Sequence, residues 1–176
     1  SISSYDKASA QFVFAGAENG RLIEREKLVN DMISAVKAGE YQKTIAATAM
    51  TVEPEITEAQ AKESFKRIGT YTTTTTSNKA RNENIRIASD ALNGLIIQPG
   101  EEFSFNLTTG NRTPEKGYKA AGAYVNGVLV EEPGGGVCQV SSTLYNAVVF
   151  AGLKTTERHA HSYEPSYVTP GEDAMV

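Results

Sequence analysis

The chain has 176 residues, of which 40% are hydrophobic and 22% are charged, and its formal net charge is −4. This composition allows one or two small domains with apolar cores, and the scattered Lys and Arg residues exclude a basic nucleic-acid-binding surface. No apolar run approaches the roughly 18 residues of a membrane span, and the single cysteine excludes an internal disulfide. We therefore expect no nucleic-acid partner, and membrane attachment only through a segment outside this chain.

The first part of the chain is predicted to be a small module in which strands and helices alternate. Hydrophobic periodicity predicts strands at residues 12–14 and 44–52, and helices at residues 23–38 and 57–68. Thr57 is a favourable N-cap, because its hydroxyl can accept a hydrogen bond from a backbone N–H of the first turn. This order fits a small α/β or α+β module with its boundary near residues 67–70.

The second part is predicted to combine helices with a β-hairpin. The expected elements, in chain order, are a strand over the threonine run 72–76, a helix at 78–92, a strand at 102–105, a hairpin at 122–131, a helix at 138–151 and a strand at 154–162. Asn126-Gly127 supplies the two residues that a type I′ turn requires. The fold class predicted is α+β, with two small modules at residues 1–68 and 69–176. The second module is expected to have a core of hairpin, glycine loop, helix and strand.

The only cysteine, Cys138, follows three glycines at the start of the second amphipathic helix of this module. Free backbone N–H groups and the positive end of the helix dipole favour a thiolate at such a position. We therefore predict a Cys138 thiol with a low pKa, suited to nucleophilic chemistry. The alternative is a small buried apolar residue after a tight turn.

Both histidines of the chain, His159 and His161, lie in the predicted strand at 154–162, where residues two apart share one face. The helix would be about 20 Å long and the strand about 23 Å, so a reversal near Gly152 would return the histidines to the Cys138 end. This arrangement suits a thiol nucleophile with a histidine base, and Asp173 could orient that histidine. The alternative is two ordinary polar residues on a half-exposed strand.

The same three side chains, Cys138, His159 and His161, are also ligand types that zinc accepts. A catalytic zinc ion with a bound water is therefore an alternative hypothesis. Spacing fixes no acidic ligand nearby and the chain has no second cysteine, so we assign no metal and no cofactor.

Polar and glycine residues around Cys138 are candidates for binding a ligand, and these are Gly135, Gly136, Gln139, Ser141, Ser142, Tyr145 and Arg158. The glycines let a backbone approach closely, and Gln139 could donate to an oxyanion. Arg158 could hold a carboxylate, and Tyr145 could stack on a sugar. The two serines could instead cap the first turns of the helix.

Four segments form an ordered pattern, namely Gly134-Gly135-Gly136-Val137-Cys138-Gln139-Val140-Ser141-Ser142-Thr143-Leu144-Tyr145-Asn146-Ala147, Glu157-Arg158-His159-Ala160-His161-Ser162, Tyr167-Val168-Thr169-Pro170-Gly171 and Asp173-Ala174. Together they resemble the signature of the VanW-like domain, over residues 68–176. Residues 1–68 resemble the peptidoglycan-binding module that often precedes such domains. VanW-like domains usually continue past the Asp-Ala segment, so further domain sequence is expected after Val176.

The resemblance implies a Gram-positive protein on the extracellular face of the cell envelope, membrane-anchored in its full-length form. It also implies an occasional genetic link to glycopeptide resistance. The leading hypothesis is a thiol-dependent acyl transferase or amide hydrolase that acts on peptidoglycan stem peptides. One alternative is a non-catalytic protein that binds peptidoglycan, chiefly through residues 1–68, and is associated with glycopeptide resistance. The other is a zinc-dependent envelope hydrolase.

Overall fold

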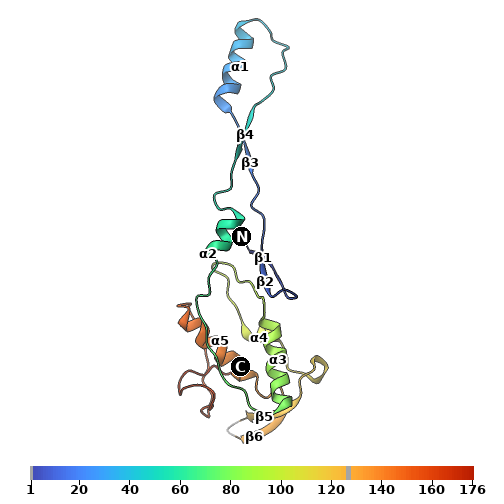
Figure 1. Ribbon diagram of the computed structural model, residues 1–176, viewed down its shortest axis with the longest axis vertical. Coiled ribbons are helices and arrows are strands. Elements are labelled where there is room, and N and C mark those ends of the chain that lie inside the picture. The colour runs from blue at the N-terminus through green and yellow to red at the C-terminus, as the bar shows by residue number, and fades with distance from the viewer. Residues whose placement is uncertain (1, 126–127) are drawn as a thin grey trace. The chain divides into compact units, whose positions relative to one another are not determined.

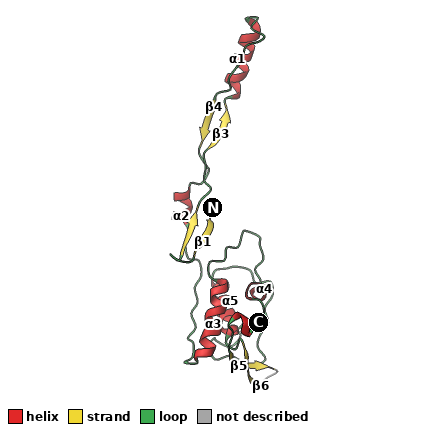
Figure 2. Ribbon diagram, turned by 90° about the vertical axis from the view of Figure 1, so that its right-hand side faces the viewer, coloured by secondary structure: helices red, strands yellow, loops and turns green. Residues whose placement is uncertain are grey.

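The computed structural model describes residues 2–125 and 128–176, which form two compact units, unit 1 (Ser1–Phe65) and unit 2 (Lys66–Val176). Both units combine helices with small antiparallel sheets, which confirms the predicted α+β class (Figures 1 and 2). In the described part of the chain, no helix has the length and apolar character that crossing a bilayer requires.

Unit 1 consists of two antiparallel ribbons and two helices (Figure 1). β1 (Ile2–Asp6) pairs with β2 (Gln11–Phe14), while β3 (Gly20–Ile23) pairs with β4 (Ala49–Val52) and α1 (Arg25–Lys37) lies between them in sequence. The predicted cap of α2 (Glu58–Ser64) is confirmed. The Thr57 hydroxyl accepts from the Gln60 backbone N–H, and the Gln60 amide oxygen accepts from the Thr57 N–H.

Aromatic rings supply most of the packing between β2 and the end of α2. The ring of Phe65 meets those of Phe12 and Phe14 at centroid distances of 5.0 and 5.6 Å. Ala35 is the only buried residue among those described in unit 1, so the apolar stripe predicted for α1 remains largely exposed. This unit therefore buries little apolar surface of its own.

Unit 2 is built on two helices that pack against each other, α3 (Lys79–Leu92) and α5 (Val137–Phe150). Between them in sequence come α4 (Phe105–Thr109), a short 3₁₀ turn η1 (Pro114–Lys116), and the hairpin of β5 (Ala120–Val125) and β6 (Val128–Pro133). Both helices and the hairpin lie where the sequence predicts them. The expected turn at 126–127 lies outside the described residues. The buried apolar core is formed by Ala88, Tyr118, Val137 and Val140.

Three segments predicted as strands are not strands in the structure. Among the described residues, the segments 72–76, 102–105 and 154–162 pair with no strand, and a strand needs a partner for its backbone hydrogen bonds. The threonine run is attached to α5 by side chains instead, with the Thr73 and Thr143 hydroxyls 2.8 Å apart. A short helix, α4, begins after Ser104, whose hydroxyl accepts from the Leu107 N–H.

Candidate functional site

The glycine turn before α5 fixes the position of Cys138. Gly136 is the N-cap of the helix and has a φ of 103°, a conformation that favours glycine. Gly135 is buried against β5, where an added Cβ would lie 2.3 Å from the Ala121 carbonyl oxygen. Cys138 is consequently in the first turn of α5, as predicted. The close approach that these glycines allow in the structure is to other parts of the chain.

The side chains of α5 separate onto different faces. Helical spacing places Cys138 and Ser142 on one face and turns Gln139 away from them. The Gln139 amide nitrogen donates to the Thr73 hydroxyl at 2.9 Å and to the Thr74 carbonyl at 3.0 Å, which engages both of its hydrogens. The structure therefore does not bring the predicted oxyanion donor Gln139 together with Cys138.

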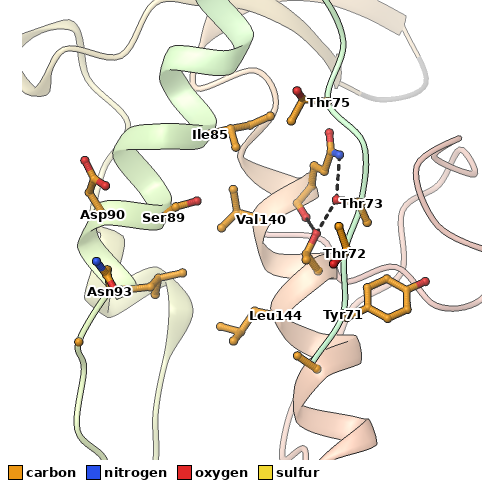
Figure 3. Close-up of a pocket in the computed structure, with 15 residues that line it drawn as sticks. Tyr71, Thr72, Thr73, Thr75, Ile85, Ser89, Asp90, Asn93, Val140 and Leu144 are labelled. Carbon is orange, nitrogen blue, oxygen red and sulfur yellow. Dashed lines mark hydrogen bonds between the residues drawn. The ribbon is translucent and has the colours of Figure 1, made fainter. Parts of the chain in front are cut away.

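The face of α5 that carries Gln139 lines an open pocket of about 640 Å³ (Figure 3). Ile85 and Ser89 of α3 form one side, Val140 and Leu144 of α5 form the other, and the threonine segment closes it. The lining includes none of the four predicted catalytic residues. This pocket is separate from the Cys138 face, so we do not place the predicted chemistry there.

The Cys138 face of α5 is covered by the segment 172–176. The Ser141 hydroxyl donates to the Ala174 carbonyl at 2.6 Å, and the Ala174 N–H donates to the Ser142 hydroxyl at 2.9 Å. The Ser142 hydroxyl also donates back to the Cys138 carbonyl at 2.7 Å. Ser141 and Ser142 thus hold the backbone of segment 172–176 on the helix.

The surroundings of Cys138 favour its protonated thiol over the thiolate. Its thiol donates to the Val176 carbonyl at 3.5 Å. Burial raises the pKa of the Cys138 thiol, and the Val176 backbone contact and the positive charge of Arg112 offset this only in part. The predicted low pKa is therefore wrong: the helix start is present, but burial under segment 172–176 outweighs it.

We expect iodoacetamide to alkylate Cys138 slowly at neutral pH, with a rate that rises only above the ordinary thiol pKa of about 8.5. The cause is the burial that disfavours the thiolate. The measurement is the alkylation rate against pH, with the denatured chain as the reference. A midpoint in the folded protein below that of the denatured chain would contradict this expectation.

The Asp173 carboxylate contacts two of the other predicted site residues, His161 and Arg158. Its Oδ2 accepts from the His161 backbone N–H at 2.6 Å and lies 2.6 Å from His161 Nδ1. Its Oδ1 accepts from Arg158 at 3.0 Å, and Arg158 also donates to the carbonyl groups of Asp173 and Gly171. The structure thus joins Arg158, His161 and Asp173 in one network, with the carboxylate next to the imidazole as an orienting group would be.

The two histidines lie in different environments, although the sequence predicts a shared face. The His159 side chain is 62% exposed and its Nε2 pairs with Glu157 at 2.7 Å, whereas the His161 side chain is 15% exposed and contacts Asp173. Within residues 2–125 and 128–176, no hydrogen bond joins Cys138 to either histidine. The two histidines do not share a face because segment 154–162 is irregular rather than a strand.

The predicted Tyr145 also finds a partner inside the protein. The Arg158 guanidinium carbon lies 5.5 Å from the centre of the Tyr145 ring, which is a cation–π contact. One face of this ring is therefore engaged by Arg158, and sugar stacking there remains a prediction.

The described side chains do not form a metal site. Across the described parts of the chain, no three His, Cys, Asp or Glu residues converge in a way that could hold a metal ion. Cys138 is directed at Val176, while the two histidines contact separate carboxylates. The donor set expected for zinc is therefore dispersed, and we derive no chemistry through a metal.

The network around Asp173 should make unit 2 sensitive to acid. Burial raises the pKa of Asp173, but the hydrogen bonds from the His161 backbone and side chain outweigh it, so the pKa lies below its ordinary value. A depressed carboxyl pKa adds stability that is fully present above about pH 4 and is lost as the pH falls through the folded-state pKa. At pH 7 we expect Asp173→Asn to lower the free energy of unfolding by about 2 kcal/mol. The variant should therefore unfold at a lower temperature than wild type.

This difference should shrink as the pH falls below about 4 and the wild-type carboxylate becomes protonated. Thermal unfolding of both proteins from about pH 2 to about pH 7 measures this stability difference. Glu157→Gln is the matched control, because Glu157 is an exposed carboxylate that contacts the other histidine. A stability difference that is constant across this range would show that the charge of Asp173 is not the cause.

Two arginines that the sequence did not single out lie against the glycine turn. A Cβ on Gly136 would lie 2.7 Å from Arg81 Cγ, and one on Gly134 would lie 2.7 Å from Arg112 Cβ. Arg81 belongs to the first turns of α3, and Arg112 to the loop between α4 and η1. No motif connects them to Cys138, because only tertiary packing brings them to the turn.

Comparison with known proteins assigns the family. A sequence model described as VanW like protein matches residues 80–176. The chain is 43% identical over 140 residues, or 78% of its length, to the Bacillus subtilis (strain 168) protein named Uncharacterized protein YoaR, of which 46% is covered. It is 36% identical over 78 residues, or 44% of its length, to Vancomycin B-type resistance protein VanW of Enterococcus faecalis (strain ATCC 700802 / V583), of which 28% is covered.

The chain spans less than half the length of these two relatives. No solved structure matches it. The family model covers more than half of the chain, including α3, the glycine turn, Cys138 and the Asp173 network. The chain therefore belongs to the VanW-like protein family.

Proposed function

We propose that the protein works on the outer face of a bacterial cell envelope, where unit 2 binds peptidoglycan stem peptides without transforming them. The main support for a non-catalytic function is that the Cys138 thiol is protonated and hydrogen-bonded. Its thiol donates to a backbone carbonyl, and burial raises its pKa, whereas a nucleophile needs a thiolate or an adjacent base. The relative named as a vancomycin resistance protein supports a role at the envelope.

A peptide is the ligand class that the chemistry of this face favours. Side chains of α5 already hold the backbone of segment 172–176, with Ser141 and Asn146 donating to its carbonyl groups and Ser142 accepting from its N–H. Short polar side chains of this kind recognise extended backbone independently of its sequence. The resemblance of residues 1–68 to a peptidoglycan-binding module supports the wall as the source of the peptide.

Co-sedimentation of the full chain with purified peptidoglycan tests this function. We expect the protein to pellet with peptidoglycan and to remain in the supernatant with an equal mass of cellulose. Asp173→Asn should weaken pelleting, because the network that shapes this face loses its charge, and Glu157→Gln should not. A wild-type protein that stays in the supernatant would refute the proposal.

Thiol-dependent acyl transfer is the second candidate, and one observation favours it. The Asp173–His161 pair has the arrangement of an orienting carboxylate and a base. For catalysis, Cys138 would have to exchange its Val176 contact for His161. Mass spectrometry of the peptidoglycan after incubation separates the two functions. A cleaved or newly joined peptide that disappears with Cys138→Ala would favour the enzyme, and unchanged peptidoglycan would favour binding.

A further inference from the structure

We propose that Arg81 and Arg112 form a carboxylate-binding site beside the glycine turn of residues 134–136, and that this site takes the C-terminal carboxylate of a peptide. The inference rests on the proposed function, because it names the group of the stem peptide that unit 2 would recognise. It goes further in assigning two residues and a charge to that recognition.

The two arginines are positioned by the absence of side chains on the turn. An added Cβ on Gly136 would lie 2.7 Å from Arg81 Cγ and 3.4 Å from its Nε, and one on Gly134 would lie 2.7 and 2.9 Å from Arg112 Cβ and Cγ. The two stems therefore pack on positions only two residues apart, from α3 on one side and from the loop before η1 on the other. This brings two guanidinium-bearing side chains to one short turn.

Both arginines have a buried nitrogen atom without a partner. Among the described residues, Arg81 Nη1 and Arg112 Nε are sealed from solvent and make no hydrogen bond. Burying a donor without an acceptor is unfavourable, and more so for a charged group. Arg112 Nη2 donates to Asn106 Oδ1 at 2.7 Å, a bond that fixes the guanidinium without neutralising it.

Neither arginine is paired with a carboxylate in the described part of the chain. Asp173 is the acidic group whose charge reaches Cys138 and Tyr167 in this region, and it is engaged by Arg158 and His161.

The Tyr167 phenol and the Cys138 thiol do not supply a negative charge to this region. Burial raises the pKa of Tyr167 to about 12 and also raises that of Cys138. The start of α5 adds the positive end of its dipole at Gly136. The region is therefore cationic, and no carboxylate among the described residues forms an ion pair with either arginine.

The donor geometry of arginine favours a carboxylate over a phosphate. A guanidinium presents a planar fork of N–H donors, which matches the two oxygens of a planar carboxylate. A phosphate carries more charge and more acceptor oxygens, and would require further donors. Both arginines are half-buried rather than fully enclosed, so part of each side chain remains exposed to solvent.

Isothermal titration of the full chain with N-acetyl-D-alanyl-D-alanine and with its C-terminal amide tests the site. The two probes differ in the terminal charge and otherwise share the peptide. We expect the free acid to bind about tenfold or more tightly than the amide, as the loss of charge-assisted hydrogen bonds implies. Equal affinity for acid and amide would overturn the proposal, as would the absence of binding by the acid.

Variants assign the effect to the two residues. Arg81→Gln and Arg112→Gln should each weaken binding of the acid about tenfold and leave the amide unchanged. Arg86→Gln is the matched control, because Arg86 is on the same helix as Arg81 but is paired with Glu83 and Asp90 on the surface. If a glutamine variant does not fold, Arg→Lys at the same position keeps the charge and removes the planar fork. This variant should still lower the affinity for the free-acid peptide.

An equal loss of affinity in Arg86→Gln would show only a general effect of net charge and would overturn the assignment. Inorganic phosphate that binds while the free acid does not would replace the carboxylate with another oxyanion and likewise overturn it. Peptidoglycan that still pellets the chain when the acid fails to bind would reject this site and leave the proposed function intact. Acid binding without pelleting would support the site and reject peptidoglycan as its source.

Discussion

Replacing Asn84 with alanine is expected to lower the free energy of unfolding of unit 2 by about 3–5 kcal/mol, because one buried and two partly buried hydrogen bonds to the backbone would be lost. Asn84 is fully buried on α3. Its amide oxygen accepts from the Lys119 N–H at 2.7 Å, and its nitrogen donates to the carbonyl groups of Lys119 and Gly135, both at 2.9 Å. One side chain thus ties α3 to the start of β5 and to the glycine turn.

Chemical denaturation followed by circular dichroism measures this loss. Asn82→Ala is the matched control, since Asn82 is on the same helix and its amide makes one bond, to the Thr76 carbonyl at 2.7 Å. We expect that control to cost about 1 kcal/mol. Asn84→Ala should also speed alkylation of Cys138, because the turn that positions the thiol would lose its anchor. Similar losses in both variants would show that Asn84 has no special structural role.

The helices of unit 2 were predictable because their information is local. The apolar spacing of α5 and the glycines that bound it identify the element and place Cys138 in its first turn. Asn78 caps α3 with its side chain, which is again a signal contained in a few consecutive residues. Patterns of this kind do not depend on the rest of the fold.

The strand predicted at 154–162 failed because strand formation depends on a partner. Threonine content and two-residue alternation favour an extended backbone, and the sequence cannot say whether another strand lies alongside. In the structure, the backbone of this segment meets segment 172–176 at the Met175 N–H and the His159 carbonyl, 2.8 Å apart. The Arg158 and His161 side chains and the His161 backbone N–H also contact Asp173, while His159 pairs with Glu157, so the two histidines lie in different surroundings.

The chemistry of Cys138 shows the same division between local and distant information. The sequence locates the thiol at a helix start, and this feature alone favours a thiolate. The pKa is instead decided by burial, to which the distant segment 172–176 contributes. Arg81, Arg112 and Asn84 were missed for the same reason, since they reach the glycine turn only through tertiary packing.

Gly135→Ala is expected to destabilise unit 2 by about 3 kcal/mol or more, because the new methyl group would collide with backbone rather than with a movable side chain. Its Cβ would lie 2.3 Å from the Ala121 carbonyl oxygen and 2.8 Å from that of Gly122. The glycine turn would have to move away from β5, and Cys138 and the stems of the two arginines would move with it.

Gly122→Ala, on β5, is the control for this variant. Its Cβ would meet only the end of the Leu129 side chain, at 3.3 Å, so a loss of about 1 kcal/mol or less is expected. Thermal unfolding gives the stability of both variants, and titration with the free-acid peptide gives the state of the site. If Gly135→Ala were as stable as Gly122→Ala, β5 would not confine the turn. The rigid placement of Arg81 and Arg112 beside Cys138 would then lose its structural basis.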